Sequence, residues 1–186
     1  PKCLDVLADG SEDWKVSWLL SELEASWNEI KPLLDSKDAG WECDTQLLNF
    51  KTHNTRPIKG RNIAIAEWKC DSRWADYALF VGTELVGIVE AKRHIKNVMS
   101  DLIQAKNYSK IVKEENEATF KLHPNSDTYK VPFMFSTNGK QYLKQIKYAS
   151  GIWFWDGREQ TNVERPLSDW FSPTDLKEKL LFDENQ

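Results

Sequence analysis

The chain has 186 residues, of which 40% are hydrophobic and 29% charged, and this size and composition predict one globular domain that buries a core without metal or disulfide staples. No apolar run approaches the roughly 18 residues of a membrane-spanning helix, and the first residues lack the layout of a signal peptide, which predicts a cytoplasmic protein that does not contact membranes. The formal net charge of -4 counts against a nucleic-acid binder, because affinity for phosphates comes mainly from Lys and Arg, unless the basic surface is local or another module delivers the DNA.

The first part of the chain predicts a helix over residues 11–34, a strand over 41–50 and a loop over 51–62. Large apolar residues recur in the helix at intervals of mostly three and four, as on one buried helix face. They are Trp14, Trp18, Leu19, Leu23, Trp27, Ile30 and Leu34. Ala39-Gly40 is a typical helix end.

A dense β region and a second helix are expected next. Two apolar runs, 75–81 and 85–90, flank Gly82-Thr83-Glu84, which is the pattern of a β-hairpin. Residues 97–112 return to helical spacing, and a charged connector covers 114–129.

The remaining chain predicts three strands and a last helix. The strands cover 131–135, 141–146 and 151–155, with Pro132 at a strand start or a sheet edge. Ser172 followed by Pro173 predicts the start of a helix that runs to about Phe182. The alternation of strands and helices predicts the α/β class, with a central mixed β-sheet flanked by α-helices.

Two acidic residues and one lysine are predicted to meet at the end of the hairpin. In a hairpin centred on Thr83, residues whose numbers sum to 166 lie opposite each other, so Asp76 faces Glu90 with the Cβ atoms about 5 Å apart. Because side chains alternate along a strand, Lys92 emerges on the same face as Glu90.

Two adjacent carboxylates at the ends of apolar strands repel each other, and a divalent cation relieves this repulsion. Asp76, Glu90 and the backbone carbonyl of Ala91 are hard oxygen ligands, which suit Mg²⁺ or Mn²⁺ rather than zinc. Such an ion activates water and a phosphodiester, and Lys92 orients or deprotonates the water. An ordinary salt bridge of Lys92 with one or both acids is the alternative interpretation.

Asp76, followed by Glu90-Ala91-Lys92, resembles the D…ExK motif of the PD-(D/E)XK nuclease superfamily. The chain also resembles the N-terminal nuclease domain of the R (restriction) subunit of type I restriction-modification enzymes. This likeness spans about residues 39–155 and rests on three blocks in order: Ala75-Asp76-Tyr77, Val89-Glu90-Ala91-Lys92-Arg93 and Pro132-Phe133-Met134-Phe135-Ser136-Thr137-Asn138-Gly139. Ala75 stands where the superfamily name has proline, and that proline only shapes the entry of the strand. The resemblance implies a restriction-endonuclease-like version of the predicted α/β fold.

Two further features are similar to those of RecB-like members of the superfamily. Gln104 and Tyr108 match the QxxxY motif of the helix after ExK, and a separation of four places both on one helix face. The family implies that they position DNA or the catalytic groups, whereas a solvated Gln and a core Tyr are the alternative. Relatives also place a metal-assisting acid on the first helix, for which Glu29 is the best match. Glu22 and Glu24 compete for this role.

The resemblance implies a magnesium- or manganese-dependent endonuclease that hydrolyses double-stranded DNA within an ATP-dependent type I restriction enzyme. Partners would be translocase modules of the same polypeptide and separate modification and specificity subunits. The chain has no GxxxxGK[ST] phosphate loop, so ATP would act only through the translocase part. We expect residues 1–186 to be a single nuclease domain at the start of a larger R subunit, with 171–186 leading into the translocase region.

Two other functions stay open at this stage. One is a freestanding RecB-like exonuclease or resolvase with the same site, and the other is an inactive interaction module of the same fold, with Asp76, Glu90 and Lys92 in a structural ion network. Metal titration separates the second from an enzyme.

Basic, aromatic, cysteine and histidine residues give further predictions about surface, core and metal sites. A local positive surface is expected from Lys92, Arg93, His94, Lys96, Lys106 and Lys110. Thr137-Asn138-Gly139, with Lys140 and Lys144, offers groups for a phosphate, although a plain strand-end turn explains them equally well. Most tryptophans have a core explanation rather than forming an aromatic cage. The scattered cysteines and histidines predict free buried thiols and no zinc site.

Overall fold

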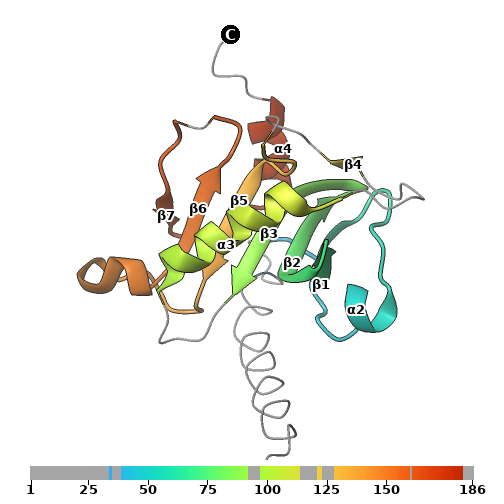
Figure 1. The fold of residues 1–186 in the computed structure, drawn as a ribbon, viewed down its shortest axis with the longest axis horizontal. Coiled ribbons are helices and arrows are strands. Elements are labelled where there is room, and N and C mark those ends of the chain that lie inside the picture. The colour runs from blue at the N-terminus through green and yellow to red at the C-terminus, as the bar shows by residue number, and fades with distance from the viewer. Residues whose placement is uncertain are drawn as a thin grey trace, which may run out of the picture.

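The computed structural model describes residues 34, 39–91, 97–113, 121–122, 128–159 and 161–181, which form a mixed sheet with helices on both faces. The strands are ordered β1-β2-β3-β5-β6-β7, and β4 pairs with β3 beside this path (Figure 1). The α/β class and the mixed sheet flanked by helices are therefore confirmed.

Two antiparallel units are joined by one parallel pair. The strands β1 (Asn62–Cys70), β2 (Arg73–Val81) and β3 (Glu84–Ala91) are antiparallel neighbours, as are β5 (Phe133–Thr137), β6 (Ile152–Asp156) and β7 (Arg165–Leu167). β3 and β5 run parallel. A parallel pair requires a crossover, and α3 (Val98–Ile111) lies on the connection between these two strands.

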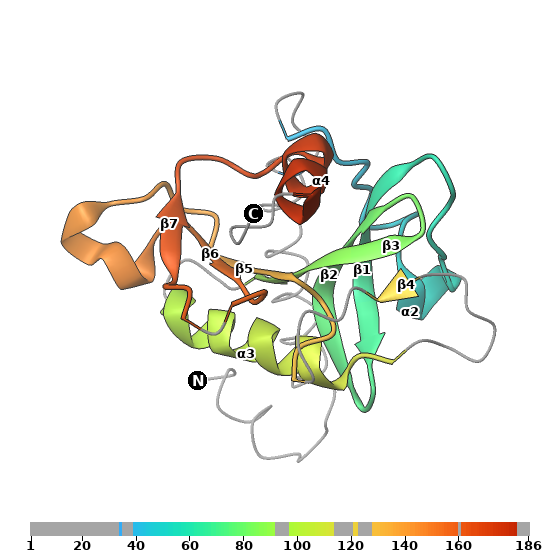
Figure 2. The same ribbon diagram turned by 90° about the horizontal axis from the view of Figure 1, so that it is seen from above.

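Each face of the sheet buries its own apolar cluster. α3 covers one face, where Ile88, Met134 and Leu102 are fully buried. On the other face α4 (Pro173–Leu181) and Trp170 pack over residues that include Val89 and Phe135. Figure 2 shows α3 and α4 on opposite sides of the sheet. Because both faces are covered, the central strands are buried along most of their length.

The predicted hairpin is confirmed, and its predicted register is confirmed in the half that lies away from the turn. Tyr77 pairs with Val89 and Leu79 with Gly87, so these numbers sum to 166 as expected. An irregularity between Leu79 and Phe80 shifts the pairing by one residue nearer the turn. The turn is therefore Gly82-Thr83, with Glu84 already in β3, and Gly82 has the positive φ of 60° that suits glycine.

Four other predicted elements are confirmed, with small shifts at their ends. The side chain of Asn97 caps α3 by accepting a hydrogen bond from the Met99 N–H at 2.9 Å. β6 lies where a strand is expected, and β5 begins just after Pro132, which lies at the strand start as predicted. α4 begins with a reciprocal capping box between Ser172 and Asp175, at 2.8 and 3.1 Å.

The predicted strand at 41–50 is wrong. This segment makes two isolated bridges with β1 and is otherwise irregular. The Asp44 carboxylate accepts hydrogen bonds from the N–H groups of Gln46 and Leu47, which forms a turn in place of extended backbone. Asn49 then caps the short helix α2 (Phe50–His53) through the Thr52 N–H at 3.0 Å.

The predicted strand at 141–146 is also wrong. Every residue from 141 to 148 is exposed, and residues 144–149 form 3₁₀ turns on either side of a kink at Ile146, together labelled η2 (Lys144–Ala149). Local hydrogen bonds close this segment on itself, because the Gly151 N–H donates to the Lys140 carbonyl at 3.0 Å and the Leu143 N–H donates to the Ser150 hydroxyl at 2.9 Å. The structure adds two short strands that were not predicted, β4 (Lys121–Leu122) within the charged connector and β7.

The predicted helix at 11–34 lies outside the described residues except for Leu34, which is helical and fully buried. Cys43 and Cys70 are buried free thiols, as predicted. The core interpretation of the tryptophans is confirmed for five of those described, Trp41, Trp68, Trp153, Trp155 and Trp170, whereas Trp74 is 37% exposed. No helix in the described ranges has the length and apolar character needed to span a membrane.

Ser109 links the last turn of α3 to the start of β5 and gives a test of this packing. Its fully buried hydroxyl donates to the Val131 carbonyl and accepts from the Val131 N–H, both at 3.0 Å. Ser109→Ala leaves both backbone groups without this partner and should lower the free energy of unfolding by about 1–3 kcal/mol in urea denaturation. The control Ser100→Ala removes an exposed hydroxyl that donates to the Asn97 carbonyl. This change should alter the free energy of unfolding by less than about 0.5 kcal/mol. Equal losses for the two variants would contradict this packing.

Candidate active site

Asp76 and Glu90 lie together where β2 and β3 separate. The register that pairs Tyr77 with Val89 places Asp76 opposite Glu90 when it is extended by one residue. Oδ2 of Asp76 accepts a hydrogen bond from the Ala91 N–H at 2.6 Å, so the Asp76 carboxylate reaches across to β3 directly beside Glu90. The backbone contact thus comes from the N–H of Ala91, the residue whose carbonyl was the predicted metal ligand.

Gln104 connects Glu90 to Tyr108. The Gln104 amide nitrogen donates to Oε1 of Glu90 at 2.6 Å and to the Tyr108 hydroxyl at 2.8 Å. Glu90 is 1% exposed and Tyr108 is 4% exposed. An amide has two N–H donors, so these two bonds use both of them and fix the orientation of the amide. The structure therefore brings together four of the predicted residues: Asp76, Glu90, Gln104 and Tyr108.

The position of α3 over Glu90 depends on a neighbouring serine. Ser136 is the β5 partner of Glu90, and its buried hydroxyl donates to the Val98 carbonyl in the first turn of α3 at 2.7 Å. Apolar contacts of Val98, Leu102 and Ala105 hold the same helix against the sheet. Sequence analysis assigned no role to Ser136, because its only signal is a polar residue at the end of an apolar run.

The surroundings of the acids are poorly solvated. Burial, with the charge of Glu90 acting in the same direction, raises the pKa of the Cys70 thiol to about 12. Burial also raises the pKa of Tyr77, whose hydroxyl contacts Thr45 at 3.0 Å, and the charge of Asp76 acts in the same direction. Cys70 is thus a neutral thiol at physiological pH, which makes it neither a nucleophile nor a thiolate ligand.

The donor set fits magnesium better than zinc. In the described part of the chain there is no group of three or more His, Cys, Asp or Glu side chains that could hold a metal ion. Mg²⁺ usually keeps several waters and binds through one or two carboxylates, whereas structural zinc needs four protein ligands and catalytic zinc usually three. Asp76 and Glu90 supply two carboxylates, so they match the first pattern.

Glu67 is a second buried acid near this end of the sheet that sequence analysis missed. It lies between residues of β1 that pair with Ala75 and Tyr77, and it is therefore level with Asp76. Its φ of 47° is in the left-handed region, which is costly for a residue other than glycine. The carboxylate binds Asn49 at 3.1 Å and Lys51 at 2.9 Å, which ties the segment before β1 to the sheet.

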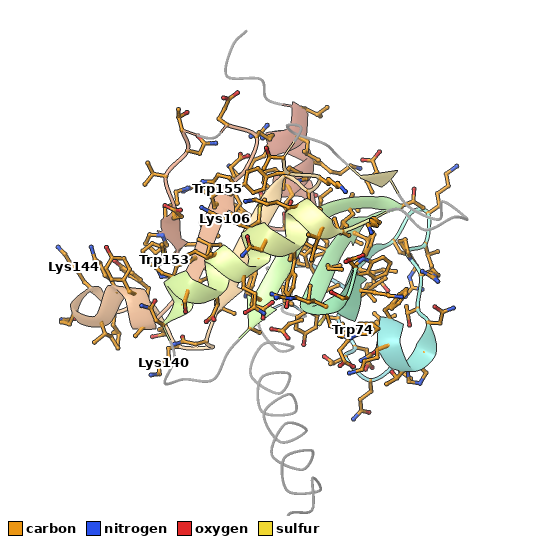
Figure 3. All side chains as sticks on the ribbon, in the orientation of Figure 1. Trp74, Lys106, Lys140, Lys144, Trp153 and Trp155 are labelled. Atoms are coloured by element: carbon orange, nitrogen blue, oxygen red, sulfur yellow. The ribbon has the colours of Figure 1, made fainter. Side chains whose placement is uncertain are left out.

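The other predicted residues either lie outside the described part of the chain or have partners elsewhere. Lys92, Arg93, His94 and Lys96 lie outside the described residues, as do Glu29 and its alternatives Glu22 and Glu24. Lys106 pairs with Glu164 and lies over the Trp155 ring at 3.8 Å (Figure 3). The Lys106 ammonium is therefore engaged within the protein and adds little to a positive surface.

A cavity of about 590 Å³ lies elsewhere in the molecule. Its lining residues come from β6, the β6–β7 connection, β7, Phe171 and α4, and they include Asp156, Arg165 and Lys179. None of the site residues lines this cavity, and its basic and acidic side chains balance. This cavity is therefore separate from the Asp76–Glu90 site.

Comparison with known proteins connects the chain to restriction enzymes. A family model described as the second domain of the type I restriction enzyme EcoKI endonuclease subunit matches residues 42–180. The type I restriction enzyme EcoKI endonuclease subunit of Escherichia coli (strain K12) is 33% identical over 187 residues, which cover 85% of this chain and 16% of that protein. The chain thus spans about a sixth of the length of this relative. No solved structure gives a significant match.

The contact of Gln104 with Glu90 can be tested by giving residue 104 a negative charge. Gln104→Glu replaces the donating amide with a second carboxylate and should lower the free energy of unfolding by about 2 kcal/mol at pH 8. Two carboxylates at hydrogen-bond distance share a proton, so the folded variant binds more protons than the unfolded one and the deficit should shrink as the pH falls toward 5. Urea denaturation of wild type and variant across this pH range measures the difference in their free energy of unfolding. Gln145→Glu adds the same charge to an exposed position and should show no such recovery; identical pH profiles would contradict the contact.

Proposed function

Because this chain belongs to the family of type I restriction enzyme endonuclease subunits, we propose that it is the metal-dependent nuclease domain of such a subunit and hydrolyses DNA phosphodiester bonds. The restriction-enzyme role follows from the family. The assignment of the reaction to Asp76, Glu90 and Lys92 is the proposal. The geometry at the end of the β2–β3 hairpin supports it for Asp76 and Glu90, and the ExK spacing supports it for Lys92.

The adjacency of Asp76 and the almost fully buried Glu90 is the observation that carries the proposal. Two neighbouring carboxylates in poorly solvated surroundings destabilise the fold unless a cation or protons compensate them. A purely structural role is served more simply by a neutral pair, so the presence of two acids favours a site that binds a metal cation.

Each residue has a separate task in the proposed reaction. Asp76 and Glu90 bind Mg²⁺ or Mn²⁺, and the Ala91 carbonyl is a third candidate ligand. Such an ion, when bound, would supply charge stabilisation at the scissile phosphate and would activate the attacking water. Lys92, two residues after Glu90 as in the ExK motif, orients or deprotonates the attacking water. Gln104 and Tyr108 position Glu90 through the hydrogen bonds described above.

The proposed setting is a larger ATP-dependent enzyme. The chain corresponds to 16% of the relative's length, so translocase modules of the same polypeptide and separate modification and specificity subunits are proposed partners. In this arrangement ATP acts through the translocase, and double-stranded DNA is brought to Asp76 and Glu90 by the other modules. The acidic net charge of the chain is compatible with such delivery.

Metal binding is the first test. Isothermal titration of Mn²⁺ into the chain should give a saturable site, and the bound ion should raise the midpoint of thermal unfolding. Glu90→Gln keeps the shape of the side chain and removes its charge, so Mn²⁺ affinity should fall at least tenfold. The control Glu178→Gln removes an exposed carboxylate of α4 and should leave the titration unchanged. If Mn²⁺ binds wild type and Glu90→Gln equally, the acids form a structural network and the proposed function fails.

Cleavage is the second test, in the assembled enzyme with a plasmid substrate. Lys92→Ala removes the proposed catalytic amine, and the cleavage rate should fall by at least about 100-fold. ATP hydrolysis, Mn²⁺ binding and thermal stability should stay near their wild-type values. Lys59→Ala, at an exposed position, is the matched control. Normal cleavage by the Lys92 variant refutes its assignment.

A further inference from the structure

An exposed arm projects from the sheet beside the candidate active site. The arm comprises residues 140–148 and includes most of η2, which is the orange coil at the left of Figure 1. Its large apolar side chains are 39–49% exposed, an unusual density for one short segment. They are Tyr142, Leu143, Ile146 and Tyr148.

The arm lies in a basic part of the sequence. Residues 128–155 contain no Asp or Glu and four lysines, in a chain whose net charge is -4. Three of these lysines belong to the arm: Lys140, Lys144 and Lys147. Figure 3 shows Lys144 on the projecting coil and Lys140 near its base. The arm is therefore a local positive surface on an acidic chain.

The arm and the acid pair lie at the same end of the sheet. β5 runs parallel to β3, with Ser136 beside Glu90 and Thr137 beside Ala91. The arm begins three residues after Thr137, where β5 ends, and η2 contacts α3. A molecule bound against the arm thus lies at the same end of the sheet as Glu90.

Hydrogen bonds at the base hold the arm in place. The side-chain amide of the fully buried Asn138 donates to the Ala149 carbonyl at 2.9 Å. The Trp153 indole N–H is 3.1 Å from the carbonyls of Lys147 and Ser150. Gly151 has a φ of 87° and lies so close to Tyr142 that an added Cβ would be 3.0 Å from its Cβ. The lysines of the arm therefore project from a segment whose base is fixed by hydrogen bonds.

We propose that this arm binds the sugar-phosphate backbone of duplex DNA next to the scissile phosphate, without reading the base sequence. This inference rests on the proposed nuclease function. Lys140, Lys144 and Lys147 contact phosphates, and the Tyr142 and Tyr148 hydroxyls donate to the same backbone. Exposed Leu143 and Ile146 offer apolar surface of the kind that enters a minor groove. A protein partner fits less well, because lysine is depleted at protein–protein interfaces.

The test measures DNA binding by the full chain and its dependence on salt. The probes are two fluorescent duplexes of 30 base pairs with unrelated sequences, and Ca²⁺ replaces Mg²⁺ to prevent cleavage. The variant K140A/K144A/K147A is compared with K59A/K69A/K177A, which removes three exposed lysines elsewhere. Each phosphate contact contributes about 0.9 to the slope of log K against log salt. The arm variant should therefore lose about 2–3 from this slope and bind both duplexes at least tenfold more weakly at 50 mM salt.

The outcomes separate this inference from the proposed function. If the two triple variants lose the same affinity, or if the arm variant keeps the wild-type salt slope, the arm is not a DNA contact. If the arm variant binds DNA normally but no longer assembles with the other parts of the enzyme, the arm binds protein and the inference is overturned. If neither wild type nor control binds either duplex, the inference fails together with direct DNA contact by this chain. Mn²⁺ binding at Glu90 then still decides the proposed function independently.

Discussion

The pairing of β2 with β3 decides which side chains meet at the end of the sheet. A one-residue slip in an antiparallel pair moves every side chain of a strand to the opposite face, and Asp76 and Glu90 would then no longer share the face beneath α3. The register is kept near the site, where Tyr77 faces Val89, and changes by one residue nearer the turn. The irregularity therefore adjusts the hairpin to its short Gly82-Thr83 turn and leaves the acid pair in place.

α3 converts this pairing into a defined site. Gln104 binds Glu90 from the middle of the helix, Ser136 anchors the first turn through Val98, and Ser109 anchors the last turn through Val131. Each of these bonds lies in buried or partly buried surroundings, where an unmade hydrogen bond is costly. The helix is thus fixed at both ends, and the Gln104 amide has a constrained position relative to the carboxylate. Preorganisation of this kind is what a metal or phosphate site requires.

Sequence predicted the elements whose cause is local. The hairpin follows from two apolar runs around a glycine-containing turn, and α3 and α4 follow from helical spacing and their capping residues. The segments 41–50 and 141–146 also contain hydrophobic residues spaced like those of a strand, yet neither is one. Asp44 and Asn49 bind nearby backbone groups in the first segment, and Ser150 and Gly151 close the second on itself. Ser136 and Glu67 escaped prediction because their partners are distant in sequence.

The local distribution of charge resolves the conflict between an acidic chain and a DNA substrate. Net charge governs long-range attraction, but salt-screened contacts act within about 10 Å at 0.1 M ionic strength. What matters at the site is therefore the charge of the nearest surface. Residues 128–155 contain lysines and no acids. This stretch includes β5, whose last residues lie beside Glu90 and Ala91. Other modules can supply the long-range attraction, while the lysines of the arm provide the short-range contacts that hold a phosphate backbone near a pair of carboxylates.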